Sequence, residues 1–346
     1  MNQVIRTLIV DDSAFVRKTV REMLSRSPWI EVVGAARDGI EALELVEQLK
    51  PHVVTCDLNM PRLDGPGFVR QQMSRRPLPI LILSVANGQA AHAIEALEAG
   101  AVDFVQKPTS LANDDLLRIR EELVDKVKAA ANVPAKVLAV SGDGTSKKTV
   151  VAPRAASRVE VVVIGVSTGG PQALRALLPR FPESFPVPIV MVLHMPVGFT
   201  ALYASKLNEI CPLEVREAVE GDELRPGLGL LAQAGRHLKL ERSASGRVVS
   251  RLALQPIHLL HRPSVDVLFQ SAAEIYGENV LGVVMTGMGS DGREGAAWIK
   301  AKGGTVMTEA EESCIIYGMP RSVVEAGLSD AAVPLPRLAE AIMERL

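Results

Sequence analysis

The sequence has few aromatic residues, few cysteines, little net charge and no long apolar run. Aromatic residues make up 3% of its 346 residues and hydrophobic residues 47%, so its cores must be mainly aliphatic, as they are around buried parallel sheets. No apolar run approaches the roughly 20 residues of a membrane-spanning helix. A net charge of −2 argues against a general nucleic-acid-binding protein.

The three cysteines, Cys56, Cys211 and Cys314, are odd in number and widely spaced. Their spacing is typical of neither a metal site nor a disulfide framework, which favours a reducing compartment. The first residues reach an acidic side chain at Asp11, too early for the apolar core of a signal peptide. We therefore expect a cytoplasmic protein without membrane insertion.

The length allows about two domains, and the pattern of the chain changes near residue 130. Residues 1–130 alternate strand-like runs with helical periodicity, which predicts a flavodoxin-like fold with a five-stranded, parallel, doubly wound sheet. The predicted strands are Ile5–Val10, Glu31–Ala35, Val53–Cys56, Ile80–Leu83 and Asp103–Val105. Residues 131–157 lose this periodicity and are predicted to form a flexible linker. Residues 158–346 resume the alternation, which predicts a second doubly wound, mostly parallel α/β domain.

Three carboxylates are expected to converge at one edge of the first sheet. Asp11 and Asp12 follow the first predicted strand, and Asp57 follows the third. Because these strands are neighbours in a doubly wound sheet, the carboxylates would repel one another unless a cation such as Mg²⁺ lay among them. Lys107 and Ser84 follow two further strands and could contact a transferred phosphoryl group. The alternative is that Asp11 and Asp12 only cap the next helix.

These residues resemble those of a response-regulator receiver domain. The matching segments are VDDS at 10–13, DLNMPRLDG at 57–65, Ser84 and Lys-Pro at 107–108. The resemblance implies that a histidine kinase is the phosphodonor and that Asp57 is the phosphoacceptor. It implies four Mg²⁺ ligands: Asp11 through a water, Asp12, Asp57 and the carbonyl of Asn59. It also implies three switch residues: Ser84, Phe104 and Lys107.

Three polar residues of the second domain each follow an apolar run that is typical of a buried strand. The runs are EVVVIG, VPIVMVL and VLGVVM, and the residues after them are Ser167, His194 and Asp291. Open parallel sheets place their active sites at the carboxyl ends of the strands. A nucleophile, a base and an orienting acid at that edge predict acyl hydrolysis.

The turn around Ser167, GVSTGGPQ at 165–172, can be compared with three known motifs: a dinucleotide-binding loop, a P-loop and an α/β-hydrolase elbow. The glycine spacing does not match a dinucleotide fingerprint, and a P-loop would need a Lys-Ser/Thr end that is absent. The literal G-x-S-x-G imitates an α/β-hydrolase elbow, but that fold has the order Ser, Asp, His rather than Ser, His, Asp. The amides that open the following helix could stabilise an oxyanion.

His194 and Asp291 each have a structural alternative. A histidine at a strand end is often structural, and Asp291 could only cap the following helix. Of the other histidines, His237 lies in a polar stretch and is expected to be exposed. His258 and His261 form an H-x-x-H pair without a third metal ligand, and we expect both at a surface or groove.

These segments, with RPSVDVLF at 262–269 and GMPRSVVEAG at 318–327, resemble the catalytic domain of the chemotaxis protein-glutamate methylesterases. The resemblance implies a phosphorylation-activated hydrolase that removes methyl esters from glutamates of methyl-accepting chemoreceptors and releases methanol. Deamidation of receptor glutamines is a further activity of that family. By resemblance, Ser167 is the nucleophile, His194 the base and Asp291 its orienting acid. The amide of Met288, with Thr168 nearby, is implied to form the oxyanion hole.

The resemblance assigns no cofactor to ester hydrolysis and gives Mg²⁺ a role only in receiver phosphorylation. The unphosphorylated receiver is expected to cover the triad. Leu193 and His261, next to the site, are expected to affect substrate fit or partner choice. A monomer is expected because no heptad pattern is sustained. Two alternatives remain: a response regulator with a DNA-binding output, which would bind nucleic acid, and a binding module without catalysis.

Overall fold

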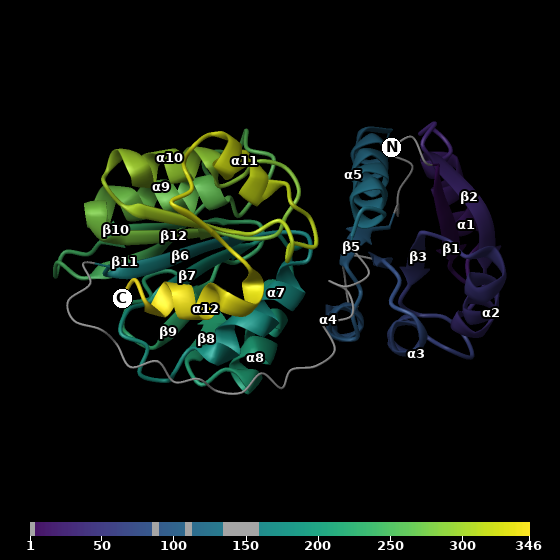
Figure 1. Cartoon of the computed structure of the whole chain (residues 1–346), viewed down its shortest axis with the longest axis horizontal. Coiled ribbons are helices and arrows are strands. Elements are labelled where there is room, and N and C mark those ends of the chain that lie inside the picture. The colour runs from purple at the N-terminus through teal and green to yellow at the C-terminus, as the bar shows by residue number, and fades with distance from the viewer. Residues whose placement is uncertain (1–3, 85–89, 108–112, 134–158) are drawn as a thin grey trace. The chain divides into compact units, whose positions relative to one another are not determined.

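The computed structural model describes residues 4–84, 90–107, 113–133 and 159–346. These residues form two compact units, one before and one after residues 134–158 in the sequence. Figure 1 colours the first unit purple to blue and the second teal to yellow. The predicted linker, 131–157, lies outside the described residues apart from 131–133. No helix within the described ranges is long and apolar enough to cross a membrane.

The sheet of the first unit has five parallel strands in the order β2-β1-β3-β4-β5. The strands are β1 (Ile5–Val10), β2 (Ile30–Ala36), β3 (Val53–Asp57), β4 (Ile80–Ser84) and β5 (Asp103–Gln106). The helices are α1 (Ala14–Leu24), α2 (Gly39–Leu49), α3 (Gly65–Arg75), α4 (Ala90–Glu98) and α5 (Asn113–Ala130). Helix α1 packs against α5, while α3 packs against α2 and α4. Both β3 and β4 are buried along their length, as helices on two faces require. The predicted flavodoxin-like sheet is confirmed.

The sheet of the second unit has seven strands in the order β14-β13-β12-β6-β7-β9-β8, and every pairing in it is parallel. Strand β6 (Val161–Val166) is central, flanked by β7 (Ile189–Leu193) and β12 (Val280–Val284), and β13 (Thr305–Glu309) lies beyond β12. The outer strands are β8 (Glu214–Glu217), β9 (Leu228–Leu231) and β14 (Ala331–Val333). The predicted parallel α/β architecture is confirmed.

Helices cover both faces of this second sheet. One face carries α9 (Val265–Tyr276), α10 (Arg293–Ala301) and α11 (Met319–Glu325), and the other carries α7 (Gly170–Leu177), α8 (Thr200–Ile210) and α12 (Leu335–Met343) (Figure 1). The aliphatic side chains of β6, β7 and β12 therefore lie in a core made mainly of Val, Leu and Ala. The scarcity of aromatic residues agrees with this arrangement.

An antiparallel hairpin, β10 (His237–Arg242) and β11 (Val248–Ala253), lies outside the main sheet and packs on α9. Its first residue, His237, is fully buried, and its Nε2 lies 3.0 Å from the carbonyl oxygen of Pro256. The prediction of an exposed His237 is therefore wrong. The polar sequence around His237 belongs to a hairpin whose inner face packs on α9, so the histidine is buried although its neighbours in the sequence are polar. This burial lowers the pKa of His237.

Strand β6 lies where the order of the second sheet reverses. The chain continues from β6 to β7 on one side, and β12 later joins β6 on the other. The parallel registers place Leu193 opposite Val166, and Val284 opposite Gly165. The segments that leave β6, β7 and β12 therefore emerge side by side at one edge, which is where open α/β sheets bind their ligands.

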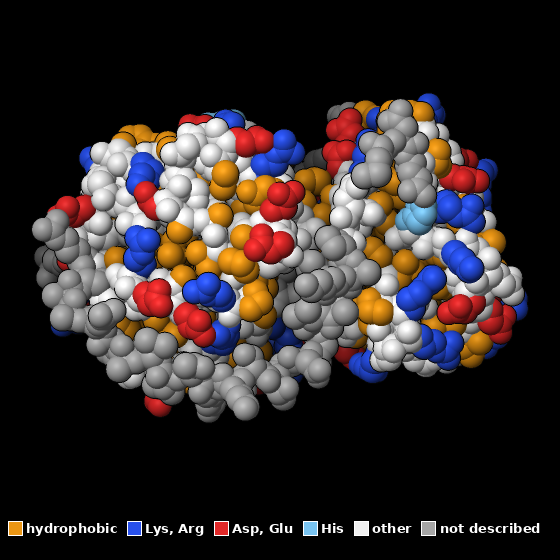
Figure 2. Space-filling view, viewed as in Figure 1, with side chains coloured by type: hydrophobic (Ala, Val, Ile, Leu, Met, Phe, Trp, Pro, Cys, Tyr) orange, Lys and Arg blue, Asp and Glu red, His pale blue; other side chains and the backbone are white. Residues whose placement is uncertain are grey.

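Charged side chains of both signs are interspersed on the visible face of each unit (Figure 2). This distribution agrees with the small net charge of −2. A surface of mixed sign does not create the extended positive field that attracts a nucleic-acid backbone. The face in view thus offers no support for the alternative of a DNA-binding output.

Candidate functional sites

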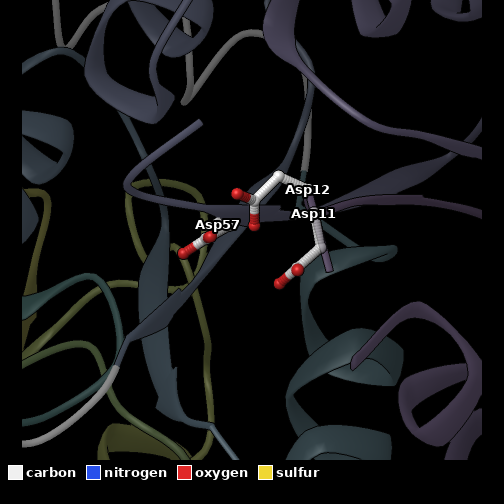
Figure 3. Close-up of side chains that lie close together, drawn as sticks. All are labelled: Asp11, Asp12 and Asp57. Atoms are coloured by element: carbon white, nitrogen blue, oxygen red, sulfur yellow. The ribbon is translucent and has the colours of Figure 1, made fainter. Parts of the chain in front are cut away.

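Three carboxylates of the first unit gather at the ends of two neighbouring strands (Figure 3). Asp11 and Asp12 follow β1, and Asp57 is the last residue of β3. One oxygen from each carboxylate lies within 4.8 Å of the others. The cap of α1 is Ser13, whose Oγ accepts from the amide of Val16, so the alternative in which these aspartates cap that helix is not observed. Hard oxygen ligands at this spacing fit a divalent cation.

Lys107 connects two of these carboxylates. Its Nζ lies 2.8 Å from Asp11 Oδ2 and 2.8 Å from Asp57 Oδ1. Burial raises the pKa of Asp57, although the hydrogen bond from Lys107 opposes the shift. Desolvation would lower the pKa of Lys107, but its bonds to both aspartates outweigh desolvation and raise it. The lysine is therefore an ammonium group held beside the Asp57 carboxylate.

The other residues predicted for this pocket lie in or just after the neighbouring strands. Ser84 ends β4 and is buried, and its carbonyl accepts from the amide of Lys107 at 2.8 Å. Phe104 is buried in β5, with Lys126 Nζ 5.5 Å from its ring centroid. Asn59 is exposed two residues after Asp57. Ser84 and Lys107 thus lie at the carboxyl edge of the sheet with the acidic cluster, whereas Phe104 pairs with Ile82 earlier in the sheet.

Ser167 is the first residue after β6, and its amide donates to the carbonyl of Thr286 at 3.0 Å. The chain turns sharply here, since the amide of Gly170 donates to the Ser167 carbonyl at 2.7 Å. Gly169 has a φ of +79°, and a Cβ there would lie 2.6 Å from Ile315 Cβ. The turn therefore requires glycine at position 169, which explains the glycine pair after Ser167.

His194 follows β7, in register with Ser167 on the neighbouring strand. Its amide donates to the carbonyl of Val166 at 3.2 Å. The preceding Leu193 is fully buried, and its Cδ1 is the atom that a Cβ on Gly170 would meet at 2.6 Å. Leu193 therefore packs beneath the serine turn rather than projecting from the sheet edge.

Asp291 is hydrogen-bonded to His194. Its Oδ2 lies 2.8 Å from His194 Nε2, and the two side chains are only 10% and 9% exposed. A carboxylate only accepts, so Nε2 carries the proton. Burial alone would raise the pKa of Asp291, but hydrogen bonds from His194 and from the amides of Asp266 and Val265 hold it well below its usual value. Asp291 is therefore an ionised acceptor.

With Nε2 protonated, Nδ1 is the basic nitrogen of His194. It is buried and has no hydrogen-bond partner within the described residues. Nor does any hydrogen bond join Ser167 Oγ to His194 within those ranges. The strands bring the serine and the histidine next to each other, and Nδ1 is left available to accept a proton.

The H-x-x-H pair separates in the structure. His258 is exposed, whereas the ring of His261 stacks on the ring of His194, with centroids 4.0 Å apart and an interplanar angle of 15°. The sequence predicts His261 at a surface or groove next to the site, from its position directly before the segment RPSVDVLF, but it does not predict this stacking. His261 lies 67 residues beyond His194 in the chain.

The loop after β12 packs against Ser167. A Cβ on Gly287 would lie 2.8 Å from Ser167 Cβ, so the backbone approaches the serine closely here. The Gly287 carbonyl accepts from the amides of Gly318 and Met319, at 3.1 and 2.8 Å. The next residue along the loop is Met288, the predicted oxyanion donor. Thr168 is buried, and its carbonyl accepts from Thr286 Oγ1 at 2.9 Å, so the serine turn is also bonded to the start of this loop.

A buried glutamate supports this loop. Glu309, the last residue of β13, is fully buried and accepts from the amide of Thr286 at 2.9 Å and from Ser313 Oγ at 3.0 Å. Burial raises its pKa to about 7, even though both hydrogen bonds oppose the shift. Sequence analysis did not identify Glu309, because an acidic residue at a strand end gives no sign of its burial.

Glu309 is expected to make the stability of the second unit pH-dependent. Its pKa of about 7 in the folded state exceeds the ordinary glutamate pKa of 4.5, so the folded state binds the proton more tightly than the unfolded state. The contribution of Glu309 to the free energy of unfolding is fully present below pH 4.5 and is lost as the pH rises through 7. The total loss is about 3 kcal/mol. Urea unfolding at pH 5 and pH 8 should show this loss in the wild type and a smaller one in Glu309→Gln. An equal loss in both proteins would contradict the assignment.

Both units match family models. The model for CheB methylesterase matches residues 162–342, and the model for the response regulator receiver domain matches residues 7–119. The chain is 49% identical over 332 residues to protein-glutamate methylesterase/protein-glutamine glutaminase 5 of Myxococcus xanthus, covering 96% of this chain and 95% of the relative. It is 40% identical over 355 residues to a Lawsonia intracellularis protein named protein-glutamate methylesterase/protein-glutamine glutaminase, covering 99% of both chains.

The second unit also resembles a solved structure, the methylesterase catalytic domain of Thermotoga maritima CheB. The TM-score is 0.53 at 41% sequence identity, and the match covers 54% of this chain and 99% of the Thermotoga chain. The matched fraction corresponds to the second unit and not to the first. The sequence relatives, in contrast, cover both units.

Proposed function

Because the chain belongs to the CheB methylesterase family, we propose that it hydrolyses glutamyl methyl esters on methyl-accepting chemoreceptors, releasing methanol and restoring the carboxylate. The observation that carries this proposal is the buried hydrogen bond between His194 and Asp291, beside Ser167 at the carboxyl edge of the sheet. A nucleophile, a base and an orienting acid suit acyl hydrolysis in a site without a cofactor.

In the first half of the reaction, Ser167 Oγ attacks the ester carbonyl and His194 Nδ1 takes the hydroxyl proton. Asp291 keeps the other proton on Nε2 and stabilises the positive imidazolium that forms. The backbone amide of Met288, with Thr168 nearby, stabilises the oxyanion of the tetrahedral intermediate. When the C–O bond breaks, His194 returns the proton to methoxide and methanol leaves.

In the second half, a water replaces methanol next to His194. The histidine removes one proton from this water, the resulting hydroxide attacks the acyl-enzyme, and the proton returns to Ser167 Oγ. The product is a glutamate carboxylate. The same sequence applied to a glutamine side chain would release ammonia, so we include receptor deamidation in the proposed function.

The first unit is proposed to control this activity. A histidine kinase transfers a phosphoryl group to Asp57, and Lys107 exchanges its contact with the carboxylate for one with a phosphoryl oxygen. Ser84 and Phe104 then respond as the switch residues. Asp12, Asp57, the Asn59 carbonyl and Asp11 through a water would hold Mg²⁺, whose charge offsets that of the phosphoryl oxygens when it is bound. The acidic cluster supports this assignment.

We propose that the unphosphorylated first unit blocks access of the receptor to Ser167 and that phosphorylation releases it. The protein is proposed to act as a cytoplasmic monomer without a nucleic-acid partner. Its three cysteines are free, in keeping with a reducing compartment.

The proposal is tested by methanol release from methylated receptor membranes, with and without a small-molecule phosphodonor. The wild type should release methanol and respond to the phosphodonor by at least about tenfold, a change of roughly 1.4 kcal/mol in activation free energy. Asp57→Asn should keep the basal rate and lose the response, because an amide cannot accept the phosphoryl group. The control is Asp125→Asn, an exposed residue of α5 whose side chain lies 3.9 Å from Lys128.

Three outcomes would count against parts of this proposal. No methanol from the wild type would contradict esterase activity, and binding to the same membranes would then favour the non-catalytic module. A phosphodonor response that survives in Asp57→Asn would exclude Asp57 as the acceptor. A chain without residues 1–156 that is no faster than the unphosphorylated full-length protein would rule out inhibition by the first unit.

A further inference from the structure

Helices α9 and α10 are capped by carboxylates from each other's segments. The residue before α9, Ser264, makes no capping bond to its own helix and instead donates from Oγ to Asp291 Oδ1 at 2.9 Å. The amides of Val265 and Asp266 donate to Asp291 at 2.8 and 3.0 Å. The residue before α10 is Gly292, which has no side chain with which to cap.

Asp266 supplies the missing cap of α10. Its Oδ1 accepts from the amide of Gly292 at 2.9 Å and from the amide of Gly295 at 2.7 Å. One of the two amides belongs to the residue that directly follows Asp291. A helix N-terminus favours such a carboxylate because its first amides have no partner within the helix.

We propose that Asp266 is a positioning residue for the catalytic acid Asp291. It binds the Asp291 carboxylate through its own amide and holds the backbone that follows Asp291 through its carboxylate. This inference rests on the proposed function, in which Asp291 orients His194. It adds a residue outside the triad that determines where the acid lies.

The loop that carries Asp291 needs such support from outside. In the segment TGMGSDG at 286–292, the glycines at 289 and 292 have positive φ angles of 86° and 100°, and neither has a side chain to anchor the loop. The Asp291 carboxylate must nevertheless meet His194 Nε2 at 2.8 Å. Loss of the Asp266 contacts would let the acid move by a fraction of an ångström, and misplacement on that scale is costly in catalysis.

Asp266 acts through the position of its side-chain oxygen rather than through its charge. Burial and the neighbouring charge of Asp291 raise the pKa of Asp266, so its ionised form is disfavoured where it lies. A neutral side chain of the same shape can still accept from both glycine amides. A longer carboxylate keeps the charge but cannot place its oxygen at the same point.

The test compares Asp266→Asn, Asp266→Glu and Asp266→Ala in the full-length protein. We expect Asp266→Asn to lose at most threefold in kcat, while the Glu and Ala variants lose 10- to 100-fold with KM changed less than twofold. The control is Asp330→Ala, which removes an acceptor for the amide of Val306 and an ion pair with Lys300 at the opposite, amino end of β13. It should lower thermal stability without lowering kcat.

A second readout does not depend on turnover. The proton on His194 Nε2, bonded to a buried carboxylate, should give a downfield proton NMR signal in the wild type and in Asp266→Asn. The signal should broaden or shift in the folded Glu and Ala variants. Wild-type kcat in folded Asp266→Ala, or an equal loss in the Asn and Ala variants, would overturn the proposal. If the wild type released no methanol, the NMR comparison would still decide whether Asp266 positions Asp291.

Discussion

Replacing Ser167 by alanine is expected to reduce kcat for methanol release by about 10⁶-fold, the loss typical of removing the nucleophile from a serine hydrolase. The substitution leaves the turn intact, because the tight geometry depends on Gly169 and on backbone bonds of Ser167 rather than on Oγ. The folded variant should still accept a phosphoryl group at Asp57. The measurement is methanol release from methylated receptor membranes in the presence of the phosphodonor.

The control for Ser167→Ala is Ser205→Ala. Ser205 is an exposed serine on α8, and its replacement should leave the rate unchanged. Methanol release by Ser167→Ala within tenfold of the wild type would mean that another group attacks the ester. In that case the pairing of His194 with Asp291 would need a different catalytic explanation.

Replacing Asp291 by asparagine is expected to reduce kcat by about 10⁴-fold with little change in shape. An asparagine that keeps its oxygen toward Ser264 Oγ and the amide of Asp266 presents its N–H groups to His194 and to the amide of Val265, which loses its acceptor. The histidine must then accept at Nε2 and carry its proton on Nδ1, the nitrogen that should take the proton from Ser167. The variant is expected to bind methylated receptors normally and to release methanol only slowly.

Asp330→Asn serves as the control for Asp291→Asn. Asp330 also accepts a backbone amide and pairs with a cation, but it lies at the amino end of the sheet. If both variants lost kcat to the same extent, the effect of Asp291→Asn would reflect stability rather than the orientation of His194. Binding of methylated receptor membranes by each variant separates a lost substrate site from a lost chemical step.

The sequence by itself determined the two folds and the edge of each sheet where polar residues gather. Alternating apolar runs and helical periods specify parallel strands with helices on both faces, and strand ends are local features of the chain. Asp11, Asp57, Ser167 and His194 could therefore be placed on neighbouring strands from their spacing alone.

Only the tertiary structure decided which distant groups meet at those edges. His261 stacks on His194, and Glu309 supports the loop after β12 from inside the core. Asp291 caps α9, the helix that contains Asp266, while Asp266 caps α10, the helix that follows Asp291. His237 became a buried residue despite its polar surroundings. Contacts between segments tens of residues apart depend on how loops pack against helix ends, and periodicity along the chain carries no information about that packing.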